Sequence, residues 1–364
     1  MEINFGASAP YTVGVEEEFQ LVDPETFALV PAIEAVLAVR DAVGIPASFV
    51  SSELSASCLE VRSPVYGTVA ELAEELPVLR RRVRDLVERC GTRLAAAGTH
   101  PFSDSTMQPI TQKDRYRRVE EKMGWTARMQ TIYGLHVHVA VPNAEYAIRA
   151  VNVLSRHVPI FIALSANSPF WSGQDTLLSS TRTKVFSLVP RSGLPPHFRF
   201  WKDFECYVDT LVASRGIPDY SWCWWDARPH PKLGTVELRA TDTQTDATCT
   251  ASLAALAQCL VATAEEHRPE DPLLTEENKW RATRHGLEAR LHDFSADRSV
   301  TAREVGRNLV EALRPISQDL GCEAQLEGVL EIVEGGNGAD KQRAVLLEDG
   351  SLQEVAAYLA AATV

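Results

Sequence analysis

The order of elements that the sequence predicts indicates an α+β fold, in which helices pack on one face of an antiparallel or mixed sheet. Strand-like alternation dominates residues 1–241, whereas helical periodicity dominates residues 246–364. The chain shows no internal repeat and no low-complexity linker between these parts. Its length of 364 residues is by itself compatible with two domains or with one large sheet wrapped in helices.

The first part is built from strands, turns and a few helices. The first 66 residues read as strands and turns, with a clear strand at 12–22, and residues 131–141 form a strongly apolar strand that ends at Pro142. Further strands are predicted at 221–226 and 235–241, and helices at 69–97 (with Pro77 inside it), 113–125 (or a loop), 144–166 (broken at Pro159) and 202–214. Residues 168–196 have no clear period, and a loop of this length is functional or disordered.

The second part is predicted to be almost entirely helical. The expected helices cover residues 247–267, 278–292, 301–320, 323–333, 340–348 and 351–362. The most apolar long segment, 247–264, carries Thr, Ser, Gln and Cys throughout, which favours a buried helix of a soluble protein over a membrane span.

Composition narrows the class of protein. A hydrophobic content of 45% and a charged content of 23% are typical of a soluble globular protein. The net charge of −13 argues against a general binder of nucleic acid or of anionic membranes. The seven cysteines are scattered without a Cys-x-x-Cys motif, and no basic stretch with an apolar run opens the chain. We therefore expect a cytoplasmic protein whose cysteines are reduced, small, buried apolar residues.

Acidic side chains inside apolar strand-like runs are the most informative feature. Glu16 and Glu18 point to one face of their predicted strand and Glu17 to the other. Glu53 and Glu60 frame a second such run. Buried carboxylates are costly without compensation, so several directed at one place require a cation, and oxygen ligands favour magnesium or manganese. The competing interpretations are an exposed strand face and an ordinary surface ion pair.

Histidine and arginine residues add to this pattern. His136 and His138 share one face of the strand 131–141, and Glu237 shares a face with Arg239. A satisfied core histidine and a Glu–Arg ion pair are the structural alternatives to a metal site. Guanidinium groups match phosphate oxygens in geometry, and the further candidates for this role are Arg182 and Arg228. No Walker A, Gly-x-Gly-x-x-Gly or Gly-x-Ser-x-Gly pattern is present, so any phosphate must be held by metal and arginine.

Several segments together resemble the type 2 glutamate–cysteine ligase family, in its carboxylate–amine ligase branch. The matching segments are Val13-Gly-Val-Glu-Glu-Glu-Phe19, Glu53–Glu60 with Val61-Arg-Ser-Pro64, Gly134-Leu-His-Val-His138, Leu164-Ser-Ala-Asn-Ser-Pro-Phe-Trp171 with Ser179-Ser-Thr-Arg182, Trp225-Asp-Ala-Arg-Pro229 with Gly234-Thr-Val-Glu-Leu-Arg239, Asn278-Lys-Trp-Arg-Ala282 and Gly335–Arg343. The resemblance covers nearly the whole chain, in the right order.

The resemblance implies a single catalytic domain over residues 1–364, with the curved, largely antiparallel sheet of the glutamine synthetase core and helices packed outside it. It implies ATP-dependent amide formation through an acyl phosphate, most often between glutamate and cysteine, with magnesium (or manganese). Six residues match the family's metal-binding positions: Glu16, Glu18, Glu53, Glu60, His138 and Glu237. Arg239, Arg182 and Arg228 match basic residues near the transferred phosphate, Arg239 and Arg228 also as nucleotide-binding residues.

The resemblance also implies small-molecule acid and amine substrates and a homodimer, and the net charge leads us to expect no nucleic acid or membrane partner. The segment 172–196 is a candidate lid that would limit hydrolysis of the intermediate. Three alternatives remain open at this point. One is a metal-dependent amide hydrolase that uses His136 and His138 with the Glu cluster, and another is a non-catalytic scaffold that keeps the fold. The third, a close variant of the ligase, is a phosphotransferase that acts on a guanidino substrate.

Overall fold

The structure is a computed structural model that describes residues 1–264, 272–293 and 297–364. Its centre is a seven-stranded sheet with strand order β10-β11-β5-β1-β3-β2, and β4 also pairs with β1. The strands are β1 (Val13–Val22), β2 (Val50–Ser52), β3 (Cys58–Arg62), β4 (Arg93–Ala95), β5 (Gly134–Ala140), β10 (Ala227–His230) and β11 (Thr235–Asp242). Every pair in this sheet is antiparallel, which confirms the predicted fold class.

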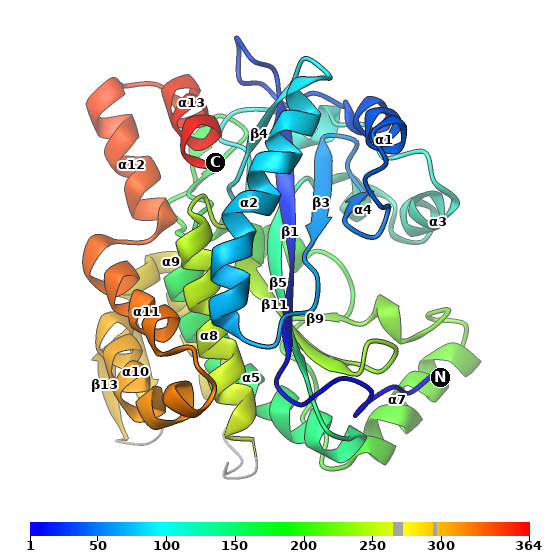
Figure 1. Ribbon diagram of the computed structural model, residues 1–364, viewed down its shortest axis with the longest axis vertical. Helices are drawn as coiled ribbons and strands as arrows, with labels where there is room; N and C mark the ends of the chain where they lie inside the picture. The colour runs from blue at the N-terminus through cyan, green and yellow to red at the C-terminus, as the bar shows by residue number, and fades with distance from the viewer. Residues whose placement is uncertain (265–271, 294–296) are drawn as a thin grey trace.

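Most of the longer helices cover one side of the sheet (Figure 1). The helices are α1 (Ile33–Ala42), α2 (Val69–Glu88), α3 (Asp114–Met123), α4 (Trp125–Arg128), α5 (Ala144–Ser165), α6 (Thr181–Phe186), α7 (Trp201–Ala213), α8 (Ala247–Ala262), α9 (Pro272–His285), α10 (Ala302–Asp319), α11 (Glu323–Gly335), α12 (Gly338–Asp349) and α13 (Leu352–Ala362). Helices α2, α5 and α8 contact the central strands directly, and α10 and α11 pack on α8. Helices α3, α4 and α7 lie on the other side of the strands in this view.

Alternation along the strands separates the two faces of the sheet. Val13 and Val15 of β1 and Val137 of β5 face the helices and are at most 2% exposed. The same apolar cluster includes residues of α2, α5, α8, α10 and α11, so it joins the strand-rich and the helical parts of the chain. Most of the intervening residues of β1, β5 and β11 are polar and occupy the opposite face. One face therefore holds the core, and the other is available for chemistry.

Two predictions for the first hundred residues are corrected. The helix expected over 69–97 ends at Glu88, and Arg93–Ala95 instead forms β4 beside β1. Gly91, with φ of +71°, lies in the left-handed region that ends helices and turns the chain back. The expectation of strands and turns alone over the first 66 residues missed α1. Its buried residues Ile33, Val36, Leu37 and Arg40 follow the spacing of a helix face.

Further corrections concern short elements. Residues 168–196 are not structureless, because they contain α6 and three two-residue strands, β6 (Phe170–Trp171), β7 (Gln174–Asp175) and β8 (Ser192–Gly193). The strand expected over 221–226 is reduced to β9 (Trp224–Trp225), which pairs with β8 outside the main sheet. The helix expected over 278–292 ends at His285 and is followed by β12 (Arg290–Asp293), paired with β13 (Arg298–Thr301). The last residues of the expected helix 247–267 lie outside the described residues.

The cysteines and the apolar helices mostly match expectation. All seven cysteines are free thiols; Cys58, Cys223, Cys259 and Cys322 are buried, whereas Cys206 is exposed, which corrects the prediction for that residue. Helix α5 is long and apolar enough to span a membrane by length and composition, but 72% of its most apolar window is buried inside the fold. A core helix of a soluble protein has this property.

A buried histidine outside the sheet should make stability depend on pH. The Nε2 atom of His100 lies 2.9 Å from the carbonyl oxygen of Phe27, and Nδ1 accepts the backbone N–H of Ser103 at 2.9 Å. Burial lowers the pKa of His100 to about 4, so the unfolded chain binds this proton more readily than the folded protein. The contribution of His100 is therefore complete above about pH 6.5, and up to about 3 kcal/mol is lost as the pH falls to about 4.

Urea unfolding at several pH values tests this expectation. The His100→Gln variant keeps a side-chain N–H but cannot titrate. Its deficit in unfolding free energy relative to the unmodified protein should therefore shrink as the pH is lowered from 7.5 to 5. A deficit that stays constant with pH would contradict the prediction.

Candidate active site

The six predicted metal-binding residues form two clusters on the polar face of the sheet. Glu16, His138 and Glu237 place one ligand atom each within 4.8 Å of one another, and Glu18, Glu53 and Glu60 do the same. Strand register accounts for this arrangement, because His138 is paired with Glu237 and Glu18 is paired with Glu60 across neighbouring strands. Glu53 follows directly after β2, the strand next to β3. Residues far apart in sequence thus meet through the sheet.

In the first cluster, His138 has the geometry of a ligand. Its Nδ1 atom lies 3.0 Å from the hydroxyl oxygen of Thr235, and its buried Nε2 has no hydrogen-bond partner among the described residues. The Nε2 atom is 3.8 Å from Oε1 of Glu16. A metal-bound imidazole uses one nitrogen as ligand while the other is held by a hydrogen bond, so this arrangement fits a metal ion.

Glu237 is held as a charged carboxylate. Nε of Arg228 donates to its Oε2 at 2.7 Å, and Nη1 of Arg239 donates to its Oε1. Burial alone would raise the pKa of Glu237, but the two guanidinium groups hold it well below the usual range. Nδ1 of His136 lies 3.2 Å from Oε2 of Glu16. His136 therefore supports Glu16 and is not in either cluster.

The second cluster has less compensation for its charge. Arg62 pairs with Glu60, but among the described residues no Lys or Arg nitrogen lies within 4 Å of the carboxylates of Glu18 or Glu53. Burial raises the pKa of Glu18 to about 7, and burial with the neighbouring Glu18 charge raises the pKa of Glu53. Burial and the Glu53 and Glu16 charges raise that of Glu60. Three crowded carboxylates fit a divalent cation with oxygen ligands, which would remove the repulsion.

The three candidate arginines have different environments. Arg182 and Arg239 line one pocket, and the Nε atom of each is buried without a partner among the described residues. Arg228 lies behind Glu237, and its Nη1 donates to the carbonyl oxygens of Ser221 and Cys223. Arg182 and Arg239 are thus able to bind an anion, whereas Arg228 is engaged in positioning Glu237.

The local structure explains how Arg182 reaches the site. Oδ2 of Asp242 accepts two hydrogen bonds from the loop that follows α5. The backbone N–H of Asn167 donates at 2.8 Å, and the hydroxyl of Ser168 donates at 2.6 Å. The Ser168 hydroxyl oxygen in turn accepts the backbone N–H of Arg182. A Cβ atom at Gly134 would lie 2.2 Å from Nη2 of Arg182, so the first residue of β5 must be glycine for the guanidinium group to pass.

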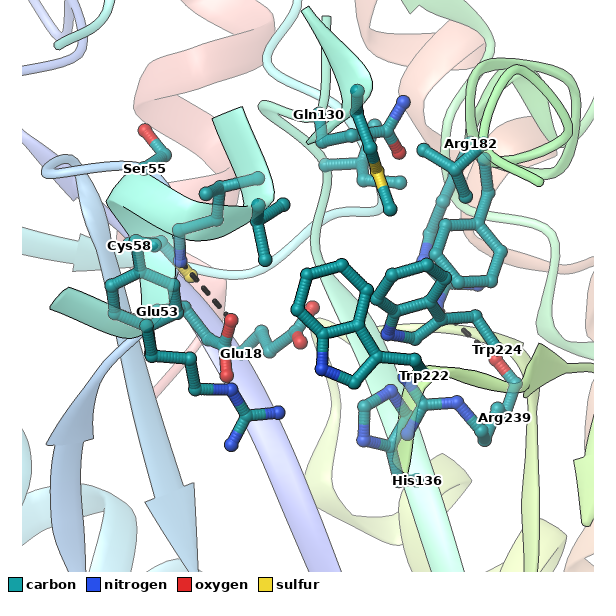
Figure 2. A pocket seen from close by; sticks show the side chains of 18 residues that line it. Glu18, Glu53, Ser55, Cys58, Gln130, His136, Arg182, Trp222, Trp224 and Arg239 are labelled. Atoms are coloured by element: carbon teal, nitrogen blue, oxygen red, sulfur yellow. Dashed lines mark hydrogen bonds between the residues drawn. The ribbon is translucent and has the colours of Figure 1, made fainter. Parts of the chain in front are cut away.

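The pocket has a cavity volume of about 120 Å³ and lies beside the second cluster. In Figure 2 the carboxylates of Glu18 and Glu53 lie on one side and Arg182 and Arg239 on the other, with the indole of Trp222 between them in this view. Residues of α3, α6 and the short helix Tyr220–Trp222 complete its wall. The expected lid region, 172–196, contributes Arg182, Phe186 and Val189 to this lining.

The pocket residues that were not singled out from the sequence include Tyr116, Gln130, Trp222 and Trp224. The hydroxyl of Tyr116 donates to the carbonyl oxygen of Ser52 at 2.6 Å, next to Glu53. These residues lie in segments without a strong period, and aromatic residues in such segments more often serve the core. The one available signal was the run of aromatic residues Trp222-Cys-Trp-Trp225 before a site strand.

The chain is similar to known proteins over most of its length. The family described as glutamate-cysteine ligase family 2 matches residues 12–357. A protein of Rubrobacter xylanophilus, provisionally named glutamate–cysteine ligase 2-3, is 66% identical over 363 residues, covering 100% of both chains. A protein of Gloeobacter violaceus, provisionally named glutamate–cysteine ligase 2, is 36% identical over 368 residues, covering 99% of both.

Two solved structures share the fold. The glutamate–cysteine ligase of Francisella tularensis in complex with AMP has a TM-score of 0.71 at 13% identity, covering 100% of this chain and 89% of that one. A bifunctional glutathione synthetase from Pasteurella multocida has a TM-score of 0.69 at 15% identity, covering 97% of this chain and 52% of that one. At such low identity the likeness concerns the fold alone.

Proposed function

The chain belongs to glutamate-cysteine ligase family 2, a family of carbon–nitrogen bond-forming ligases, and from this we propose that it is an ATP-dependent carboxylate–amine ligase acting on glutamate or a closely related acid, with cysteine or another amine as the second substrate. One observation carries the proposal. Two clusters with the chemistry of magnesium sites lie on one face of the sheet. The pocket beside them is lined by Glu18 and Glu53 of the second cluster and by two arginines, Arg182 and Arg239, whose Nε atoms have no partner among the described residues.

The chemistry explains why such a site is needed. A carboxylate is a poor acyl donor because its oxygen is a poor leaving group. Transfer of the γ-phosphoryl group of ATP to the carboxylate gives an acyl phosphate, and an amine then displaces phosphate. The protein contributes positioning and charge stabilisation in such a transfer, and little covalent chemistry.

The residues then take separable roles. Magnesium held by the two clusters would neutralise the triphosphate and the charge that develops during transfer. The Nε groups of Arg182 and Arg239 bind oxygens of the transferred phosphoryl group. Arg228 keeps Glu237 ionised and oriented, which makes it a positioning residue. The pocket walls exclude water, which limits hydrolysis of the acyl phosphate.

The hydrolase alternative receives less support. It requires His136 and His138 in one ligand set, whereas Nδ1 of His136 contacts Glu16 and His136 belongs to neither cluster. We also propose that residues 1–364 form one catalytic domain, because one apolar cluster joins the strands to α5, α8, α10 and α11. A cytoplasmic location, expected from the scattered cysteines, and a homodimer, expected from the family resemblance, are also part of this proposal.

The proposal is tested by incubating the protein with ATP, magnesium and glutamate against a panel of amines while ADP is measured. ADP release that requires both the acid and the amine supports ligation. ADP release without any amine would indicate a simple ATPase. No ADP with any pair, together with metal-dependent cleavage of an amide, would favour the hydrolase.

Removal of divalent metal should abolish turnover in this assay. A chelator is expected to stop ADP release, and excess magnesium or manganese should restore it, because the carboxylate clusters alone repel the triphosphate. Magnesium should also raise the melting temperature of the ATP-free protein by binding the folded state. Unchanged turnover after chelation and gel filtration would contradict the metal assignment.

A further inference from the structure

The proposed chemistry does not use one part of the pocket. The apolar side chains that line it include Val119, Met123, Ile132, Phe186, Trp222 and Trp224, and we call these six the apolar wall. They come from α3, from the residue pair before β5, from α6 and from the chain between Tyr220 and Trp225. All except Trp222 are only partly buried. Apolar surface left uncovered at a pocket marks a place where a ligand binds.

The size of the cavity limits what the wall can contact. Its volume is about 120 Å³. An apolar cavity of roughly 150 Å³ holds a benzene ring, so this space suits a branched alkyl group or a single ring. Lys122 and Arg191 also lie over the rings of Trp222 and Trp224, which leaves less of each indole face free to stack on a base.

Gln130 places a buried hydrogen-bond acceptor at this pocket. The side-chain nitrogen of Gln130 donates to the carbonyl oxygens of Thr126 and Val185, at 3.0 and 3.1 Å, which fixes the orientation of the amide. Its Oε1 atom is buried and has no partner among the described residues. Gln130 lines the same pocket (Figure 2). A buried acceptor without a donor favours a ligand that brings an N–H group.

We propose that the apolar wall binds the amine substrate, and that this substrate carries a compact apolar group of branched-alkyl or single-ring size beside its nitrogen. The inference rests on the proposed ligase function. The amine lone pair forms the C–N bond to the acyl carbon, the bond from that carbon to the phosphate oxygen breaks, and the proton lost by nitrogen leaves with phosphate. Oε1 of Gln130 accepts an N–H of the bound amine.

The other substrates fit the wall less well. The side chain of a glutamate-like acid ends in the reacting carboxylate, and burying that charge against apolar side chains would leave it unpaired. The triphosphate requires the carboxylate clusters and arginines on the sheet side. The amine is the remaining substrate that has an apolar part to bury. An apolar pocket distinguishes between substrates by how much apolar surface each one buries. A difference of one methylene-sized group changes transition-state binding by about 1–3 kcal/mol.

Matched amines test the proposal with glutamate as the acid and ADP as the readout. Leucine and asparagine are similar in size and differ in polarity, benzylamine carries one ring, and hydroxylamine traps acyl phosphates without contacting the wall. We expect kcat/KM for leucine or benzylamine to exceed that for asparagine at least tenfold. Equal kcat/KM values for leucine and asparagine would overturn the proposal about the wall. Turnover with hydroxylamine in the same experiment would still support the ligase function. No ADP with hydroxylamine would overturn both.

Variants of the wall provide the second arm. Trp222→Ala, or the milder Trp222→Phe if the first does not fold, should lower kcat/KM for the apolar amine at least ten times more than for hydroxylamine. Trp125→Ala is the matched control, because Trp125 is 62% exposed and does not line the pocket, and it should leave this ratio unchanged. A Trp222→Ala variant that raised KM for ATP, with no change for the amine, would assign the wall to the nucleotide and overturn the proposal.

Discussion

Replacing Glu53 with glutamine is expected to lower turnover by at least about 10³-fold, or about 4 kcal/mol of transition-state stabilisation, while the metal-free protein stays equally stable or becomes more stable. Glu53 lies among three crowded carboxylates, and burial together with the Glu18 charge raises its pKa. Removing one negative charge therefore relieves repulsion in the absence of metal. The same change removes a metal ligand, so the gain in melting temperature on adding magnesium should disappear.

Three measurements distinguish this outcome from a simple folding defect. We compare the melting temperature without metal, the melting temperature with magnesium, and ADP release. The control variant is Glu34→Gln, because Glu34 is an exposed residue of α1. Unlike Glu53→Gln, this control should match the unmodified protein in all three measurements. Glu237→Gln should also lose turnover but lower stability, because Arg228 and Arg239 would lose their buried partner. Full turnover by Glu53→Gln would remove Glu53 from the site.

The candidate site was more predictable from the sequence than the chain's path around it. Strand alternation is local, so placing Glu16 and Glu18 on the face opposite Glu17 needed only the period of β1. Bringing Glu53 and Glu237 to that face needed strand order and register, which single-sequence patterns do not contain. That step came from the family resemblance, and the two clusters have the same six residues that it indicated.

The pocket walls were not predictable for a different reason. Trp222 and Gln130 lie in short turns and irregular segments, and their position depends on how α3, α6 and β9 pack together. The role of Arg228 also depends on how separate elements pack together. An arginine beside a strand glutamate is compatible with phosphate binding or with an ion pair, and only the carbonyl oxygens of Ser221 and Cys223 show that its other donors are occupied. Long-range packing, which propensity does not encode, decided both cases.

Glu17, between two proposed metal ligands, is expected to serve stability alone. Its carboxylate accepts hydrogen bonds from Nε and Nη2 of Arg80 on α2 and from the hydroxyl of Thr250 on α8. Glu17 and Arg80 are each 1% exposed, and Arg80 also donates to the backbone oxygens of Gln244 and Thr363. This buried pair therefore connects β1, two helices and the C-terminal residues on the core side of the sheet.

Glu17→Gln should lower the free energy of unfolding by about 3–5 kcal/mol, because it leaves the Arg80 charge buried without a counter-ion. Turnover per folded molecule should change little, since Glu17 faces away from the clusters. Urea unfolding and ADP release measured on the folded fraction test both parts, and Glu18→Gln is the matched control. It replaces the next residue on the same strand and should show the reverse, retained stability with lost turnover. A Glu17→Gln protein that kept full stability would show that water or rearrangement compensates Arg80, and one that lost turnover while folded would place Glu17 in the active site.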